Sequence, residues 1–175
     1  MKKNSSRAHT KRIALGASLS AMCFAALYIG AVLEVLDLSA CLVASMVITV
    51  IVIEVGARIG WLSYFAVSVL SLVLLPYKLP ALLFALFSGF YPMIKQKAEP
   101  LGRVLSWIIK LATFNVALTL TVILCEKVFS LGEHFFALSP LLYIGGNATF
   151  VLYDVALTRL ISFYIFKLRK RMRIK

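Results

Sequence analysis

The hydrophobic positions of this 175-residue chain gather into long segments separated by short charged or proline-containing breaks. An α-helix needs about 20 apolar residues to cross the hydrocarbon core of a bilayer. Six segments approach or reach this length, and they occupy approximately residues 13–34, 38–56, 59–76, 80–94, 101–125 and 140–166. The pattern therefore predicts an all-α integral membrane protein with six transmembrane helices.

Prolines and glycines in two of these segments predict local geometry. The fourth segment is short and contains Gly89 and Pro92, which predicts a tilted or distorted helix. Pro140 opens the sixth segment and suits the first turn of a helix, where the missing N–H would have no intrahelical partner anyway.

Basic residues alternate in density from break to break, and this asymmetry predicts the topology. Fifteen of the nineteen Lys and Arg residues fall in the two ends of the chain, in the break at Arg58 and in the break that starts at Lys95. Because Lys and Arg are retained on the cytoplasmic side, these breaks are expected to be cytoplasmic, with both termini inside. We therefore expect a multi-pass plasma-membrane protein with cytoplasmic basic tails at 1–12 and 167–175 and a membrane domain at 13–166.

The net charge of +12 changes the picture of possible partners. Clusters of Lys and Arg beside a membrane span attract anionic lipid headgroups. Outside the apolar segments there is no combination of aromatic and basic residues of the kind that binds nucleic acid. Membrane lipid is therefore the expected partner, and nucleic acid is not.

Four ionisable residues fall within the apolar segments, where charge is expensive and is often functional. They are Glu54, Lys110, Asp154 and Arg159. At about 1.5 Å of rise per residue, Lys110 and Asp154 lie at matching depth, as do Glu54 and Arg159. The set is neutral, which burial of charges requires. Two interpretations remain open, namely ion pairs that hold helices together and a path for protons or ions.

A second polar set falls in the outer half of the predicted bundle. Asn115 lies near the middle of the fifth segment, and Tyr143 and Asn147 flank Gly145-Gly146 in the sixth. Irregular backbone at this depth is tolerated only inside the protein or beside a cavity. A substrate-binding pocket that opens outwards is one hypothesis, and it would use Asn115, Tyr143, Asn147, Tyr77, Lys78 and Asp37. Close helix packing at Gly145-Gly146 is the alternative.

Aromatic residues near the predicted membrane interfaces fit an aromatic belt. This set comprises Trp61, Tyr64, Tyr91, Trp107 and Tyr164. Catalytic and metal-binding patterns are not visible, because His9 and His134 have neither a paired nucleophile nor metal-ligand spacing. The sequence also has no phosphate-binding glycine loop. We therefore expect no enzymatic activity, no cofactor and no metal.

The first segment carries a stripe of small residues, Ala14, Ala17, Ala21 and Ala25, on one helical face. Small residues let helix backbones approach closely within a membrane, either inside one chain or against a partner. With six predicted helices, this stripe, Arg12-Ile13-Ala14-Leu15-Gly16-Ala17 and Leu36-Asp37-Leu38-Ser39, the chain resembles the substrate-binding S components of energy-coupling factor transporters. The break after the first segment is shorter than the corresponding loop of many S components.

This resemblance implies membrane transport, with capture of a small solute such as a vitamin from outside the cell. It also implies that the alanine stripe docks on a transmembrane coupling subunit and that two ATPase subunits supply the energy. Two other functions remain open. One is a non-transporting scaffold, similar to the rod-shape-determining membrane proteins of the cell-wall machinery. The other is a small proton-coupled carrier that uses Lys110 and Asp154.

Overall fold

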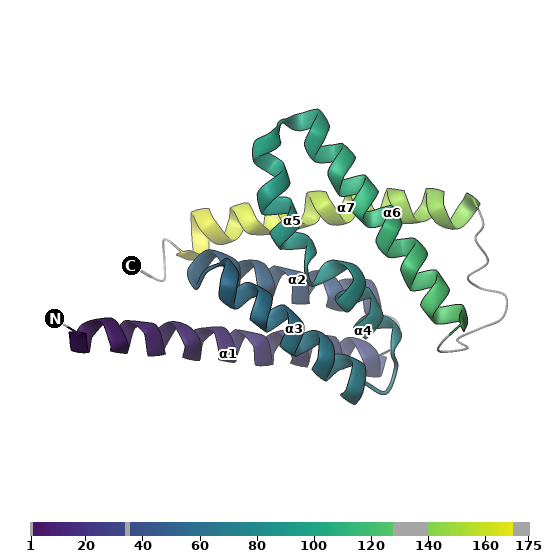
Figure 1. Ribbon diagram of the computed structural model, residues 1–175. Coiled ribbons are helices and arrows are strands. Elements are labelled where there is room, and N and C mark those ends of the chain that lie inside the picture. The colour runs from purple at the N-terminus through teal and green to yellow at the C-terminus, as the bar shows by residue number, and fades with distance from the viewer. Residues whose placement is uncertain (1, 34–35, 128–139, 170–175) are drawn as a thin grey trace.

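The computed structural model describes residues 2–33, 36–127 and 140–169, and all regular structure in these ranges is helical (Figure 1). Five helical stretches are long and apolar enough to cross a membrane: Thr10–Leu33, Asp37–Glu54, Ala57–Leu74, Arg103–Leu124 and Pro140–Lys167. By length and composition the chain is therefore an all-α, multi-pass membrane protein, as predicted. The elements in chain order are α1 (Lys2–Leu33), α2 (Asp37–Glu54), α3 (Ala57–Leu74), α4 (Leu79–Leu83), η1 (Phe84–Ser88), α5 (Tyr91–Ala98), η2 (Glu99–Leu101), α6 (Arg103–Lys127), α7 (Pro140–Phe163) and η3 (Tyr164–Arg169).

The first three helices pack side by side and enclose the larger apolar core. Glycines bring their backbones close together: a Cβ atom on Gly60 of α3 would lie 2.5 Å from Val52 Cγ2 of α2, and one on Gly30 of α1 would collide with Ala40. Such close approach is what allows van der Waals packing to hold membrane helices together. Fully buried Leu27 and Ile48 lie in the core between these helices.

The fourth predicted segment does not form one continuous helix of spanning length. It is divided into α4, the π-helical η1 and α5. The N–H of Gly89 donates to Phe84 O over 2.8 Å, which is the wide turn of a π-helix. A side chain at Gly89 would lie 2.6 Å from Tyr64 Cδ2, and Pro92 occupies the first turn of α5. The predicted distortion is confirmed.

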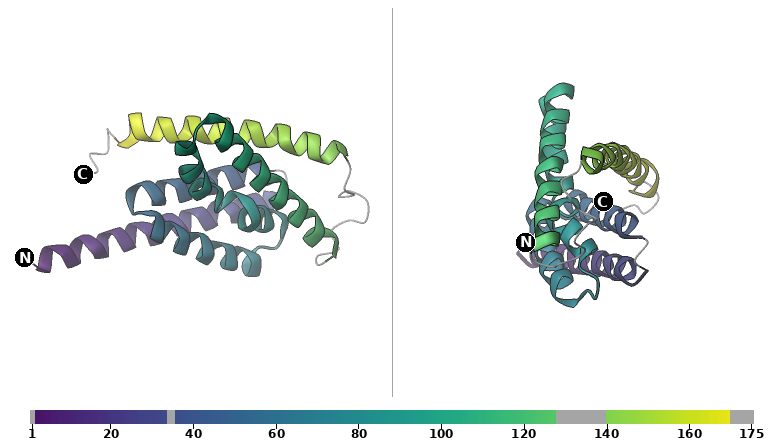
Figure 2. Two further views of the ribbon diagram at one scale, coloured as in Figure 1. Left: turned by 45° about the horizontal axis from the view of Figure 1, so that its top comes forward. Right: turned by 90° about the vertical axis from the view of Figure 1, so that its right-hand side faces the viewer.

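Helix α6 crosses the other long helices at a steep angle, whereas α1, α2 and α7 run alongside one another (Figures 1 and 2). A second apolar core forms where α5, α6 and α7 meet, around buried Tyr91, Phe150 and Leu157. Helix α7 begins at Pro140, as predicted.

The two predicted tails are partly helical. Helix α1 begins at Lys2 and therefore includes most of the 1–12 tail, while η3 extends to Arg169. The start of α1 and the end of η3 lie at the same end of the bundle (Figure 1).

Candidate functional site

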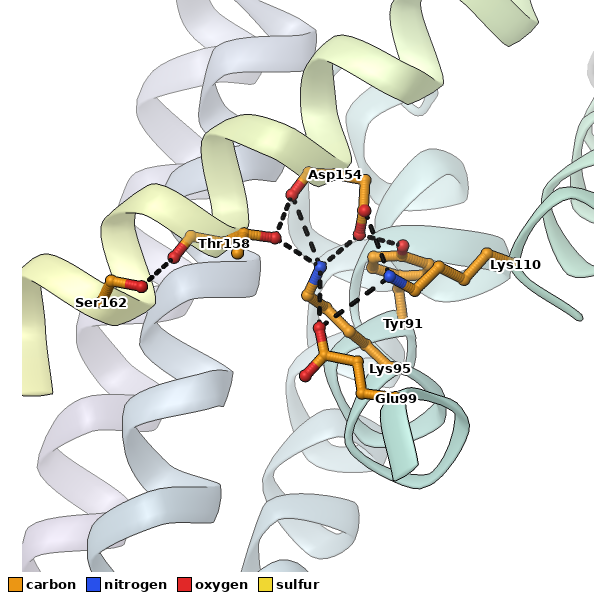
Figure 3. Close-up of polar contacts among 7 residues, drawn as sticks. All are labelled: Tyr91, Lys95, Glu99, Lys110, Asp154, Thr158 and Ser162. Carbon is orange, nitrogen blue, oxygen red and sulfur yellow. Dashed lines mark hydrogen bonds and ion pairs between the residues drawn. The ribbon is translucent and has the colours of Figure 1, made fainter. Parts of the chain in front are cut away.

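Asp154 of α7 is the centre of a buried cluster of charges (Figure 3). Its side chain is 5% exposed. Tyr91 Oη donates to Asp154 Oδ1 over 2.5 Å, and Lys95 Nζ donates to the same oxygen. Lys110 Nζ donates to Oδ2 over 3.2 Å. Both carboxylate oxygens are therefore engaged, which allows Asp154 to stay ionised away from water.

Two further residues complete the cluster. Lys95 Nζ donates to Thr158 Oγ1 over 2.7 Å and lies 3.4 Å from Glu99 Oε1. The same Glu99 oxygen is 3.9 Å from Lys110 Nζ. The side chains of Lys95 and Lys110 are 4% and 6% exposed, whereas that of Glu99 is 52% exposed. Two ammonium groups thus face two carboxylates, one buried and one at the surface.

Helical spacing brings these groups together. Tyr91, Lys95 and Glu99 are four residues apart, so they follow one face of α5 and its continuation. Asp154 and Thr158 repeat this spacing on α7, and the Thr158 hydroxyl also donates to Asp154 O over 2.7 Å. Lys110 is the contribution of α6. The cluster therefore fixes three helices relative to one another.

Two of these residues were misplaced by the sequence analysis. Lys95 was assigned to the cytoplasmic break and Tyr91 to the aromatic belt, but both are buried in the cluster. The counting of basic residues assumes that a Lys next to a break faces the membrane surface, and the irregular geometry at Gly89 invalidates that assumption. The four-residue spacing of Tyr91, Lys95 and Glu99 is the signal that could have found them.

Of the two predicted ion pairs, the structure brings together only one. Lys110 and Asp154 are in contact. The ion pairs formed by the described residues do not include one between Glu54 and Arg159. Arg159 is exposed, and Glu54 Oε1 accepts a hydrogen bond from Tyr164 Oη over 3.4 Å. Arg159 follows Asp154 by five residues, or about 140° around the helix, and so leaves the buried face of α7.

The polar residues that were predicted to line an outer pocket contact mainly one another. The side-chain amides of Asn115 and Asn147 form two reciprocal hydrogen bonds of 3.0 and 3.1 Å between α6 and α7. Tyr143 Oη lies 2.8 Å from Thr119 Oγ1. Helix α7 continues through Gly145-Gly146, so the irregular backbone expected there is absent. These residues join two helices and do not line the cavity described below.

The other three predicted pocket residues lie at helix ends. Lys78 Nζ donates to the carbonyl oxygens of Leu72 and Leu75 over 3.0 and 2.7 Å. It therefore satisfies the free carbonyls at the C-terminal end of α3, a common role for a lysine in this position. Asp37 occupies the first turn of α2, and Tyr77 packs against the larger core.

A cavity of about 290 Å³ lies between α2, the α4–η1 segment, α6 and α7. Its wall is predominantly apolar, with Phe87, Phe114, Phe150 and Tyr153 as its aromatic members. The buried hydroxyls of Ser88 and Tyr153 form no hydrogen bond with the described residues. They face the Cys41 thiol and the Ser45 hydroxyl, respectively, without reaching hydrogen-bonding geometry. The sequence analysis did not identify this site.

The aromatic wall of the cavity is continuous with the charge cluster. Phe114 and Phe150 stack at 4.7 Å between ring centroids, and the Phe87 ring meets both edge-on. Tyr91 contacts Phe87, Phe150 and Tyr153 with ring centroids 4.9 to 5.8 Å apart. Its ring therefore belongs to the aromatic cluster and its hydroxyl to the charge cluster.

The predicted docking stripe is exposed. Ala14, Ala17, Ala21 and Ala25 all lie on the uncovered face of α1. The opposite face, which includes fully buried Cys23 and Leu27, packs into the larger core.

No protein-family model, curated protein or solved structure matches this chain. Within the described ranges, no three His, Cys, Asp or Glu side chains lie close enough together to hold a metal ion. What the protein does is therefore inferred from the cavity, the charge cluster and the exposed helix face.

Proposed function

We propose that this protein is the substrate-capture subunit of a multi-component uptake system of the energy-coupling factor type. It resides in the plasma membrane, crosses it six times and keeps both termini in the cytoplasm. Its substrate is a small solute with a mainly apolar body, taken from outside the cell. A coupling subunit and two ATPase subunits supply the energy, since this chain has no phosphate-binding loop.

The distribution of charge supports this topology. If α4, η1 and α5 together make the fourth crossing, the basic residues of both ends and those near Lys97 and Arg103 fall on one side. With five crossings alone, the two basic ends would be on opposite sides, against the usual retention of Lys and Arg in the cytoplasm. A discontinuous crossing is tolerated where its irregular backbone is buried in protein, as it is at Phe84 and Ser88.

The single observation that carries the proposed function is the cavity. Its volume of about 290 Å³ is just below the range for ligand sites, roughly 300–1,000 Å³. Apolar walls with a few polar groups are typical of such sites. Buried hydroxyls without partners, as at Ser88 and Tyr153, are unfavourable. A ligand that offers them a polar atom would relieve that cost.

The exposed face of α1 supports the involvement of a partner. Lipid-facing positions nearby carry large side chains, such as Met22 and Ile29 at 58% and 57% exposure. The stripe from Ala14 to Ala25 instead presents small ones, which suit a closely packed helix from another protein.

Mass spectrometry of small molecules that co-purify with the full chain tests this function. We expect a discrete solute with the wild type and its loss in Ala117→Phe, which fills the cavity from α6, where Ala117 is 3% exposed. Ala148→Phe is the matched control, because Ala148 is exposed on α7. Equal amounts of solute in the two variants, or no solute with the wild type, would contradict the proposal.

A further inference from the structure

The side chain of Glu99 lies between the protein surface and a buried pair of lysines, Lys95 and Lys110. Its carboxylate lies 3.4 Å from Lys95 Nζ and 3.9 Å from Lys110 Nζ. Half of the Glu99 side chain is exposed, while both lysines are almost completely buried. Long, half-exposed ion pairs contribute little to stability. Glu99 can therefore leave the lysines more readily than Asp154, which is buried and engaged by three donors.

Lys110 is the lysine with hydrogen-bonding capacity to spare. An ammonium group carries three donors. Among the described residues, Lys110 Nζ makes one hydrogen bond, to Asp154 Oδ2. The Glu99 oxygen at 3.9 Å is beyond hydrogen-bonding distance, and the Trp107 ring lies 5.5 Å away. Lys110 Nζ thus keeps donors for an additional acceptor that approaches more closely than Glu99 does.

We propose that Lys95 and Lys110 form a binding site for the carboxylate of a small monocarboxylic acid, which displaces the Glu99 side chain. With Glu99 displaced, two ammonium groups face one carboxylate, Asp154. A singly charged acid restores neutrality, and a neutral molecule does not. The site is separate from the apolar cavity and reaches the surface at the turn between α5 and α6.

The turn that carries Glu99 allows this displacement. Glu99 begins the 3-10 turn η2 (Glu99–Leu101), which is followed by Gly102 with φ of +98°. The Glu99 side chain can rotate outwards while Lys95 and Lys110 stay on their α-helices.

Trp107 provides the reporter for a direct test, because Lys110 lies over its ring. The Trp61→Phe variant removes the other tryptophan, and the full chain is titrated in neutral detergent with sodium propionate while Trp107 fluorescence is followed. Propionamide is the uncharged control ligand. A second titration uses oleate in neutral lipid nanodiscs, to distinguish a membrane-borne acid from a water-soluble one.

We expect Glu99→Gln to tighten binding of one of these acids about tenfold, because the neutral amide competes less than a carboxylate for the two ammonium groups. Gln96→Lys, exposed on the same helix, adds the same unit of positive charge without removing the competing carboxylate and should change affinity much less. Lys110→Gln should remove the response in the Glu99→Gln background. Equal tightening by Gln96→Lys, an equal response to propionamide, or no saturable response to either acid with Glu99→Gln would overturn the proposal.

Discussion

The hydroxyl of Tyr91 donates a 2.5 Å hydrogen bond to Asp154, and this contact connects an aromatic cluster to a buried carboxylate. Tyr91 is fully buried, so its hydroxyl has no access to water if the bond is lost. Hydrogen bonds to charged groups contribute about 1.5–3 kcal/mol each. The contact therefore holds α5 against α7. It also connects the aromatic cluster beside the cavity to the charge cluster.

Replacing Tyr91 by Phe should lower the free energy of unfolding by about 1.5–3 kcal/mol, because the ring is retained and one hydrogen bond to Asp154 is removed. Reversible unfolding in detergent, followed by circular dichroism, measures the change. Tyr28→Phe is the matched control, since Tyr28 is 45% exposed on α1. Similar losses in the two variants would show that the Tyr91 hydroxyl contributes no specific stabilisation.

The charge cluster predicts an order of stability among single substitutions. Asp154→Leu should be the most destabilising, by about 3–5 kcal/mol, because two buried ammonium groups lose their shared partner. Lys110→Met should cost less, since Asp154 keeps Lys95 and Tyr91. The double variant Lys110→Met with Asp154→Leu should lose less than the sum of the two. Additive losses in the unfolding free energy would show that Lys110 and Asp154 do not interact.

Asn147→Leu should destabilise the protein, by about 0.6–2 kcal/mol, a typical range for hydrogen bonds between membrane helices. The sequence alone placed Asn147 in a possible substrate-binding pocket, but in the structure its amide is paired with that of Asn115. Adding Asn115→Leu should restore part of the stability, because no amide is then left without its partner. If the single variant unfolds like the wild type, the amide pair is not a stabilising contact.

The exposed stripe on α1 predicts separate effects on assembly and folding. Ala21→Trp should prevent co-purification of the proposed coupling subunit and leave the thermal stability of the isolated protein unchanged, since Ala21 is exposed. Met22→Trp is the control, because Met22 is exposed outside the stripe. Loss of stability in Ala21→Trp alone would indicate that the stripe packs within the chain.

Reporter fusions test the proposed topology. Fusions at 36, 78 and 130 should report the outside, and those at 58, 98 and 175 the cytoplasm. Position 98 is decisive, because it follows the α4–η1–α5 segment. An outside signal at 98 would mean that this segment does not cross the membrane.

Sequence reasoning succeeded where a property depends on position along a regular helix. Depth alone placed Lys110 beside Asp154, because each lies on a long helix with clear ends. The same reasoning failed for Arg159, since depth does not specify which face of a helix a residue occupies. It failed for Lys95 because the distortion at Gly89 changes where the following helix points, and no hydropathy pattern records that direction.

The cavity could not be predicted for a different reason. Its lining comes from four parts of the chain, and most of the lining residues are apolar like those of any buried helix face. The two hydroxyls at Ser88 and Tyr153 are unremarkable in the sequence, and only the folded structure shows that they are buried without hydrogen-bond partners among the described residues. The sequence shows that Asn115 and Asn147 are polar residues within apolar segments, but it does not show that their amides are hydrogen-bonded to each other.

The π-helical turn at Phe84–Ser88 precedes α5, the helix that carries Tyr91 and Lys95. A π turn accommodates one residue more than an α turn, and one residue corresponds to about 100° of rotation. The wide turn absorbs this extra residue, so deleting one residue there would restore an α turn and leave the direction of α5 almost unchanged. Deleting one residue between Tyr91 and Lys95 would instead rotate Lys95 by about 100° relative to Tyr91, away from Asp154, with almost the same hydropathy profile. The four-residue spacing from Tyr91 to Lys95 is therefore a length constraint, and a change in it would separate chains that keep the charge cluster from chains that keep only the membrane fold.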